Sequence, residues 1–377
     1  MKLAGEGAAF AGRGADDASA LYPGVCVMPS GRFLLAFRSA PSRLATEGQR
    51  VLICVSDDGG RTWSAPRDFF PNPPEIEGKR GEFFLAYITP LSETAALASL
   101  CRVDASDPSR PYYNPETRGI LDHRIFFSRS VDGGESWSEP WMLEGLPHPR
   151  PTALCSPTLL LPDGRLMCQF ETHKNHGEQG PVFFEAGLAF SADGGRRWGD
   201  YAVIVRGASG GVFHWDQRIN VVGDGLLGLF WSYDDGASKY VNIHAARSEA
   251  GAQAPLGMRW SAPYDTGVPG QPSQPVPLDD GSIAMAYVDR TAAPAIKVRR
   301  SFDGGRTWPG ESEVLVYDSA LARQDNAKGS LNDMWAEMHR FSVGFPVAAP
   351  LPGGMLVGFY AGKDTDHTAI RWAKLAL

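Results

Sequence analysis

The chain has 377 residues, of which 43% are hydrophobic and 21% are charged, values that are ordinary for a folded globular protein. Its formal net charge is −7 at pH 7, so it lacks the basic field that nucleic-acid binding requires. No stretch approaches the roughly 18 apolar residues of a spanning helix. The first residues also lack the basic and apolar regions of a secretion signal. We therefore expect a cytoplasmic protein with no nucleic-acid or membrane partner, unless a signal has been trimmed. The sequence leaves the oligomeric state open.

One unit recurs along the chain: an apolar run, a short turn and a second apolar run, which is the pattern of a β-hairpin. Five copies have glycine in the turn, at Gly31, Gly164, Gly225, Gly281 and Gly354. A glycine-free copy covers residues 87–100. The spacing is roughly 65 residues, which is room for the four short strands of a propeller blade. The only segment with a helical pattern is a short one near residues 331–338.

A second motif, Ser-x-Asp-Gly-Gly-x-x-Trp, follows four of these hairpins. Its copies are Ser56–Trp63, Ser130–Trp137, Ser191–Trp198 and Ser301–Trp308, and a degenerate copy runs from Ser248 to Trp260. The Asp side chain can accept hydrogen bonds from its own turn, and Gly-Gly permits positive φ. The Trp folds back as an apolar plug. We expect these turns to stabilise the blades and to carry no chemistry.

These repeats predict an all-β protein, a single six-bladed β-propeller over residues 1–377. The expected blades are 20–75, 80–146, 150–206, 212–266, 270–320, and 340–377 completed by 1–12. The last blade lacks the motif because the chain ends after its third strand. We therefore expect residues 2–10 to supply its outermost strand and to close the ring.

The five cysteines are expected to be reduced and buried, because most lie in apolar, strand-like runs and their number is odd. They are Cys26, Cys54, Cys101, Cys155 and Cys168. No CxxC pair is present, so a thiolate zinc site is not expected.

The Ser-x-Asp-x-Gly-x-x-Trp motif is the Asp-box, or bacterial neuraminidase repeat, and the chain resembles the sialidase superfamily over nearly its whole length. The resemblance implies a six-bladed propeller. It implies activity less directly, because Asp-boxes also occur in xyloglucanases, sortilin-type receptors and a photosystem assembly factor.

The residues that the resemblance assigns to sialidase chemistry are not kept at the matching positions. Leu21 stands where the family has the arginine that binds the substrate carboxylate, and Phe345 stands where it has the nucleophilic tyrosine. Residues 38–50 contain no Asp, only Glu47, where the family has its acid/base aspartate. We therefore do not expect standard exo-α-sialidase chemistry here, although a shifted register makes Tyr22 an alternative nucleophile.

The loops of one face are rich in polar side chains, which we expect to meet around the axis. Glu171 and Asp216 are the candidate paired carboxylates for acid/base catalysis, and His173 and His339 are candidate proton carriers. The candidate substrate-binding residues are Arg38, Arg150, His214, Trp215, Arg218, Gln274 and Arg340. The arginines suit an anionic or multiply hydroxylated sugar, and Trp215 suits stacking.

The interpretation is a sialidase-like carbohydrate-active enzyme, a glycoside hydrolase on a small-molecule or oligosaccharide substrate. Two alternatives remain. In a lyase, His173 or His339 would abstract a proton beside a uronic carboxylate. In a binding propeller, the pocket would have lost its chemistry. We expect no required cofactor and no metal; a divalent metal at His173, His176 and His214 is the alternative.

Overall fold

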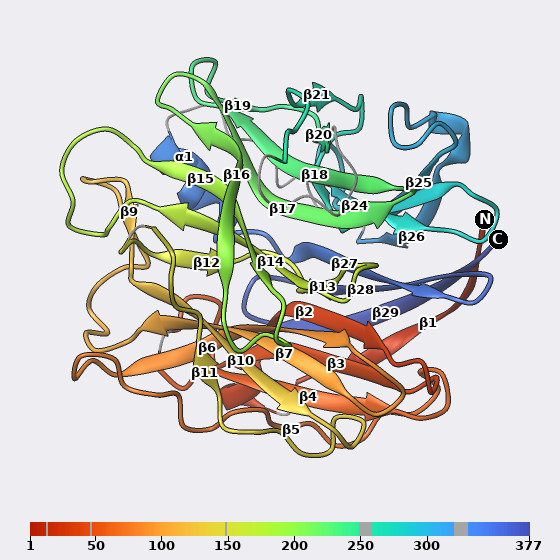
Figure 1. Cartoon of the computed structure of the whole chain (residues 1–377), viewed down its shortest axis with the longest axis horizontal. Coiled ribbons are helices and arrows are strands. Elements are labelled where there is room, and N and C mark those ends of the chain that lie inside the picture. The colour runs from red at the N-terminus through yellow and green to blue at the C-terminus, as the bar shows by residue number, and fades with distance from the viewer. Residues whose placement is uncertain (13, 46, 148, 249–257, 320–330) are drawn as a thin grey trace.

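We describe a computed structural model of the chain, which defines residues 1–12, 14–45, 47–147, 149–248, 258–319 and 331–377. The strands form a ring of β-sheets around one axis (Figure 1). Four blades are separate sheets, and the first and last blades share one 8-stranded sheet. The predicted all-β propeller is confirmed. Among the described residues, no helix has the length and apolarity needed to cross a membrane.

Each blade runs outward from the axis in chain order. Blade one contains β2 (Ser19–Val27), β3 (Phe33–Ala40), β4 (Arg50–Ser56) and β5 (Arg67–Asp68). Blade two contains β6 (Gly81–Pro90), β7 (Ala96–Asp104), β10 (His123–Ser130) and β11 (Trp141–Met142). Blade three contains β12 (Thr152–Leu154), β13 (Leu159–Leu160), β14 (Leu166–His173), β15 (Phe184–Ser191) and β16 (Gly199–Gly207).

Blade four contains β17 (Val212–Val222), β18 (Gly225–Asp234), β19 (Lys239–Tyr240), β20 (His244–Arg247) and β21 (Tyr264–Asp265). Blade five contains β22 (Gln271–Pro272), β23 (Val276–Pro277), β24 (Ile283–Asp289), β25 (Ala295–Ser301) and β26 (Val314–Asp318). Blade six contains β27 (Val343–Leu351), β28 (Gly354–Gly362), β29 (Thr368–Ala376) and β1 (Lys2–Phe10). Outside the blades lie the hairpin β8 (Tyr113–Asn114) and β9 (Gly119–Ile120), the helix α1 (Leu331–Met338) and two 3-10 turns (Ala15–Asp17 and Gly310–Ser312).

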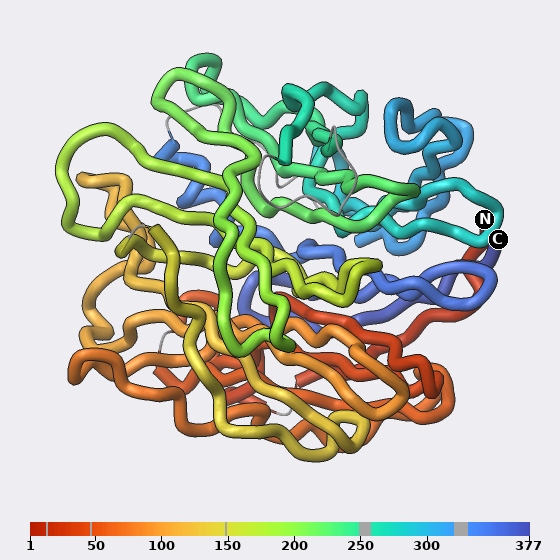
Figure 2. The backbone as a smooth tube through the Cα atoms, in the orientation of Figure 1, coloured from red at the N-terminus to blue at the C-terminus, as the bar shows by residue number. Residues whose placement is uncertain are grey.

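The ring closes through the N-terminal strand, as the sequence predicts. β1 pairs antiparallel with β29 from Lys2 opposite Ala376 to Phe10 opposite Ile370. The two chain ends consequently lie side by side (Figure 2). Blades six and one are also joined directly, because Thr368 pairs in parallel with Ser19 and its hydroxyl donates to the Ala20 carbonyl oxygen at 2.8 Å.

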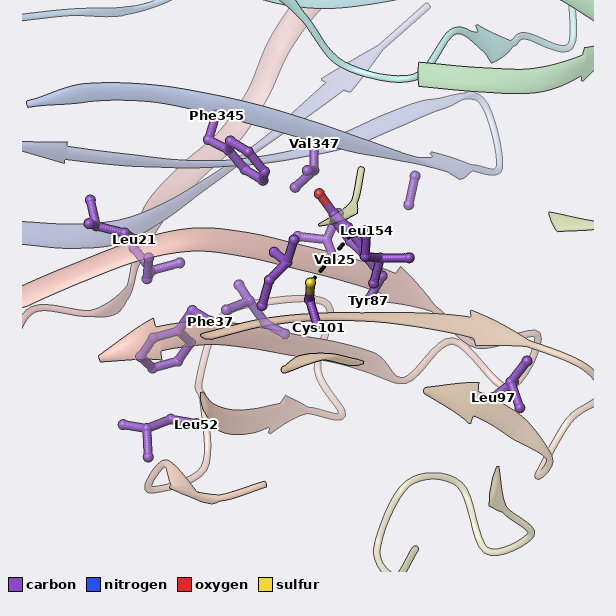
Figure 3. Close-up of a cluster of buried hydrophobic side chains, with 14 of the residues drawn as sticks. Leu21, Val25, Phe37, Leu52, Tyr87, Leu97, Cys101, Leu154, Phe345 and Val347 are labelled. Carbon is purple, nitrogen blue, oxygen red and sulfur yellow. Dashed lines mark hydrogen bonds between the residues drawn. The ribbon is translucent and has the colours of Figure 1, made fainter. Parts of the chain in front are cut away.

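Central strands are buried along their whole length because neighbouring blades cover both of their faces. All residues of β3 and β7 are buried, for example. Figure 3 shows side chains of several blades meeting between the inner strands, among them Leu21, Tyr87 and Phe345. All five cysteines are buried and free, which confirms the expectation for them.

The Asp-box turns have the structural role that the sequence predicts. In the first, Asp58 accepts hydrogen bonds from the backbone N–H of Thr62 at 2.9 Å, and Ser56 accepts one from the N–H of Gly60 at 2.8 Å. Gly59 and Gly60 have φ values of 72° and 89°, a region that favours glycine. The degenerate fourth copy retains a bridge between Ser248 and Trp260, and its middle, 249–257, lies outside the described residues.

Glycine carbonyls of these turns also bind the preceding blade. Lys374 of blade six donates to the carbonyl oxygen of Gly59, at 2.6 Å. Further contacts of this kind follow around the ring, among them Arg67 to Gly134, Trp141 to Gly195 and Tyr264 to Gly305. The repeated turn therefore connects blades as well as finishing each one.

Three inner strands carry a bulge at the same place, which determines what faces the axis. Tyr22, Asp216 and Phe345 have φ values of 53°, 50° and 52°. Each lies in a shift of register between the first two strands of its blade. A bulge bends the strand and redirects a side chain. All three side chains line the cavity described next.

Candidate active site

A cavity of about 210 Å³ lies on the axis and is lined by residues from all six blades and from α1. Its polar and charged lining comprises Tyr22, Arg38, Arg43, Gln49, Tyr112, Glu171, His173, Asp216, Gln271, Arg290, His339 and Tyr360. The remaining lining is largely apolar and aromatic, including Phe84, Trp215, Trp231, Met334, Trp335, Phe341 and Phe345. An apolar concavity with a few converging polar groups is the usual form of a small-molecule site.

Two residues that bear carboxyl groups, Glu171 and Asp216, line the cavity and are joined by a hydrogen bond. Glu171 lies near the end of β14, and its side chain accepts a hydrogen bond from the backbone N–H of Asp216 in the β17 bulge. The other oxygen of Glu171 lies 3.1 Å from Nε2 of His173. Asp216 in turn accepts a hydrogen bond from the amide of Gln271. Blades three, four and five thus each fix one part of a single network.

The two carboxyl groups have different environments. Burial raises the pKa of Asp216 above its usual range, and the charge of Glu171 raises it further. Arg218 and the Gln271 hydrogen bond act in the opposite direction. Glu171 instead accepts the backbone N–H of Asp216 and contacts the imidazole of His173. Two carboxyl groups in different surroundings are a usual arrangement for acid/base catalysis.

Three arginines, Arg38, Arg43 and Arg290, also line the cavity. Arg38, at the end of β3, donates to Gln49 at 2.9 Å and to the Ala45 carbonyl oxygen at 2.6 Å, while its Nη1 has no partner among the described residues. Arg43 donates to the carbonyl oxygens of Phe341 and Met338 at 2.7 and 2.8 Å. Burial lowers the pKa of Arg38 to about 10, so the group remains protonated at neutral pH.

Arg290 is linked to the carboxyl pair through Gln271. It donates to Gln271 at 3.3 Å and to the Val343 carbonyl oxygen at 3.0 Å. Its guanidinium lies 3.9 Å from the centre of the Phe341 ring, within the range of a cation–π contact. Gln271 therefore holds Arg290 with its oxygen and Asp216 with its nitrogen.

The β8–β9 hairpin of blade two and α1 of blade six together form the aromatic wall. Tyr113 stacks on Trp335 with ring centres 4.8 Å apart, and its hydroxyl donates to Asn332 at 2.6 Å. The hairpin is anchored to blade three, where Thr117 donates to the His176 carbonyl oxygen at 2.5 Å. Trp335 of α1 and Tyr112, which directly precedes β8, line the cavity.

Six of the predicted site residues line the cavity: Glu171, His173, Asp216, His339, Arg38 and Trp215. His339 is half-buried there. Burial, followed by the charge of Arg43, lowers the pKa of this imidazole below its usual range, so it is neutral at pH 7. A neutral imidazole can accept or relay a proton.

The other five predicted residues lie elsewhere. Arg150 forms a two-point ion pair with Glu178, and Arg340 is exposed after α1. His214 is buried within blade four, where it bonds to Ser232 at 2.8 Å. Gln274 bonds to the Ala348 carbonyl oxygen, and Arg218 is buried beneath the cavity. The expectation that these side chains meet at one pocket is wrong for this group.

The three histidines of the alternative metal site are also separated. His173 lines the cavity, whereas His176 bonds to the Pro111 carbonyl oxygen on the far side of the loop and His214 is enclosed in blade four. In the described ranges, no group of three or more His, Cys, Asp or Glu side chains is arranged to hold a metal ion.

The sequence analysis assigned no role to Arg290, Arg43 or Gln271, and it considered Tyr22 only as an alternative nucleophile in a shifted register. Arg290 directly follows β24 and Arg38 lies near the end of β3, so an arginine near the end of a second strand was the available signal. The structure also shows what occupies the position where the sequence resemblance predicts an arginine. Leu21 is fully buried in the hydrophobic cluster between blades, and the neighbouring Tyr22 is the residue that the bulge turns into the cavity.

No family model matches the chain, and no curated protein matches it. Solved structures do match. A Dyadobacter fermentans protein of unknown function is 17% identical with a TM-score of 0.74, over 100% of this chain and 99% of that one. The intramolecular trans-sialidase of Ruminococcus gnavus, bound to oseltamivir carboxylate, is 13% identical with a TM-score of 0.61, over 100% and 98%.

A third match is the α-L-arabinanase of Penicillium chrysogenum bound to arabinobiose, 13% identical with a TM-score of 0.62, over 100% and 99% of the two chains. The fold is that of sialidase-like and glycosidase propellers. At these identities the likeness establishes the fold alone, so the chemistry has to be argued from the cavity.

Proposed function

We propose that the protein is a glycoside hydrolase that binds the end of an acidic or multiply hydroxylated glycan in the axial cavity. The observation that carries this proposal is the hydrogen-bonded pair Glu171 and Asp216, which lines one cavity together with three arginines. Glycoside hydrolysis requires two carboxyl groups on either side of the scissile bond, one protonated and one ionised.

The roles follow from the environments of the two groups. Asp216, whose pKa is raised by burial, is the general acid that gives its proton to the glycosidic oxygen as the bond to the anomeric carbon breaks. Glu171 is the general base: it takes a proton from the water that attacks that carbon. His173, in contact with Glu171, orients this carboxylate.

The size and charge of the cavity define the substrate class. Its volume of about 210 Å³ is below the roughly 300–1,000 Å³ of pockets for larger ligands, which suits a single terminal sugar unit. Arg38, Arg43 and Arg290 suit a carboxylate or several hydroxyl groups on that unit, because guanidinium groups donate in a planar fork. The aromatic wall suits the apolar face of a sugar ring.

A lyase is the second candidate, favoured by the contact between His173 and Glu171. In that reaction a base removes the proton beside a uronic carboxylate, an arginine neutralises the carboxylate, and the leaving sugar departs as a double bond forms. Product analysis separates the two reactions, because elimination gives an unsaturated, ultraviolet-absorbing uronide and hydrolysis gives a reducing sugar.

The test is a turnover screen on glycosides of neutral sugars, uronic acids and sialic acid, with Glu171→Gln and Asp216→Asn beside the wild type. We expect each substitution to lower kcat by about 10²- to 10⁴-fold. Arg150→Met, which removes an ion pair outside the cavity, is the control and should retain activity. Binding of a glycan without turnover on any substrate would show a binding propeller instead. Rapid turnover of the sialoside would contradict the expectation, based on Leu21 and Phe345, that standard sialidase chemistry is absent.

A further inference from the structure

Arg218 is a fully buried cation directly beneath the cavity. Its Nη1 donates to the hydroxyl of Tyr87 at 2.7 Å and also to the carbonyl oxygen of Cys155. The Phe345 ring covers the guanidinium, with 4.6 Å between Cζ and the ring centre. These contacts come from blades two, three and six, so the guanidinium is fixed from several directions.

The remaining N–H groups of this side chain are not satisfied by protein. Neither Nε nor Nη2 of Arg218 has a hydrogen-bond partner in the described part of the chain, although both atoms are buried. No carboxylate among those residues forms an ion pair with it. An unpaired buried charge is costly, so such groups are compensated by an opposite charge or by bound water.

Asp216 is the acidic residue placed to compensate Arg218. It precedes Arg218 by two residues in β17, and the β17 bulge between Trp215 and Arg218 turns it toward the same axis. Cys155 and Phe345 line the cavity together with Asp216, and both also contact the Arg218 guanidinium. Gln271 binds one oxygen of the Asp216 carboxyl, and the other has no protein hydrogen bond among the described residues.

We propose that Arg218 is a positioning residue for Asp216, and that a water molecule enclosed beneath the cavity joins its Nε and Nη2 to the Asp216 carboxylate. A buried water typically has about three hydrogen-bond partners. Two arginine N–H groups and one carboxylate oxygen supply that number. Through this water Arg218 orients and stabilises the Asp216 carboxylate, and the water lies outside the space that the substrate occupies.

Several other charged or titratable groups also affect the ionisation of Asp216. Glu171 of β14 disfavours its charge, and Arg290 after β24 favours it. Tyr87, Tyr112 and Cys155 also face it, and burial raises the pKa of each, so they are neutral. Arg218 is therefore the main charge that opposes burial and Glu171 at this carboxyl. Its loss leaves Asp216 protonated to higher pH.

The experiment measures the ionisation of Asp216 directly, by carboxyl NMR titration of protein labelled with ¹³C-aspartate. Asp216→Asn identifies the resonance. We expect Arg218→Met to move the titration midpoint upward by about one pH unit or more, and Arg218→Lys, which keeps the charge, to remain near the wild type. Arg150→Met, the matched control outside the cavity, should leave the midpoint unchanged.

An unchanged midpoint in folded Arg218→Met overturns the proposal, because a merely structural arginine would alter stability alone. If that variant does not fold, a high-resolution crystal structure of the wild type decides. Density for a water bridging Arg218 and Asp216 supports the proposal, and a direct ion pair or continuous apolar packing between them overturns it. The consequence for catalysis rests on the proposed hydrolase, but this titration does not. Absence of turnover on every glycoside would refute the function and leave the ionisation result intact.

Discussion

Asp216 combines two unfavourable features at the residue scale: a positive φ and a buried carboxyl. Both are expected where a site is built for chemistry and not for stability. Because the folded-state pKa is raised, the folded protein binds the proton more tightly than the unfolded chain does. The contribution of this group to stability is complete below the unfolded pKa of about 3.9 and is lost as the pH rises through the folded value.

We therefore expect Asp216→Asn to be more stable than the wild type at neutral pH, with the advantage shrinking toward pH 4. Asparagine is neutral at every pH and tolerates positive φ. The measurement is the difference in thermal midpoint between the two proteins across this pH range. A difference in thermal midpoint that does not depend on pH would show that the charged form of the Asp216 carboxyl does not destabilise the folded protein.

Arg38 tests the binding role of the guanidinium groups. We expect Arg38→Met to weaken the binding of an acidic monosaccharide by about 10- to 100-fold, the range for a lost hydrogen bond to a charged group. Calorimetric titration with the acidic sugar that best stabilises the wild type measures this. Arg340→Met is the matched control, because Arg340 is exposed outside the cavity, and equal losses in the two variants would contradict the assignment.

At the element scale, the Asp-box turn has the opposite pH dependence from the site. Hydrogen bonds from the Thr62 hydroxyl and backbone lower the pKa of Asp58 to about 2, and Asp132 has the same shift through Ser136. Their stabilising effect is present above the unfolded value of about 3.9 and is lost as the pH falls through 2.

Asp58→Asn should consequently lower the thermal midpoint at neutral pH, with the deficit disappearing in acid. The same comparison in Asp57→Asn, the adjacent exposed position of the motif, should show a smaller change, because that side chain only pairs with Arg32 at the surface. Equal changes in thermal midpoint in the two variants would show that the hydrogen bonds of Asp58 within the turn do not stabilise the fold more than a surface ion pair does.

The contact between α1 and the β8–β9 hairpin also gives a prediction. Tyr113→Phe deletes the hydroxyl that binds Asn332, so we expect ligand affinity to fall by about 2- to 10-fold with little change in the global thermal midpoint. Tyr201→Phe deletes a comparable hydroxyl contact to Glu185 on the outer part of blade three and should leave affinity unchanged.

The elements and their order follow from the sequence, and much of the site does not. Repeated turns act locally, so the Asp-boxes, the hairpins and the helix near 331–338 follow from residue identity and spacing. A bulge, however, reverses which side chains face the axis. It places Asp216 in the cavity and Arg218 beneath it, although both belong to one strand. Contacts such as that of Gln271 with Arg290 form between different strands, so the local sequence around either residue does not predict them.

At the scale of the whole molecule, the ring depends on a strand from the opposite end of the chain. We expect deletion of residues 1–10 to lower the thermal midpoint and to promote association, because it exposes the edge of β29. Deletion of residues 1–4 is the matched control, since it keeps the pairs from Gly5 opposite Lys374 to Phe10 opposite Ile370. Light scattering after mild heating measures the association, and identical behaviour of the two truncations would argue against ring closure by this strand.

The pairing of β1 with β29 also constrains biosynthesis. β1 is translated before the strands of all six blades, and its partner β29 (residues 368–376) is translated after the strands of blades one to five. Blades one to five can therefore form while β1 is still unpaired, and the ring can close only once β29 has been synthesised.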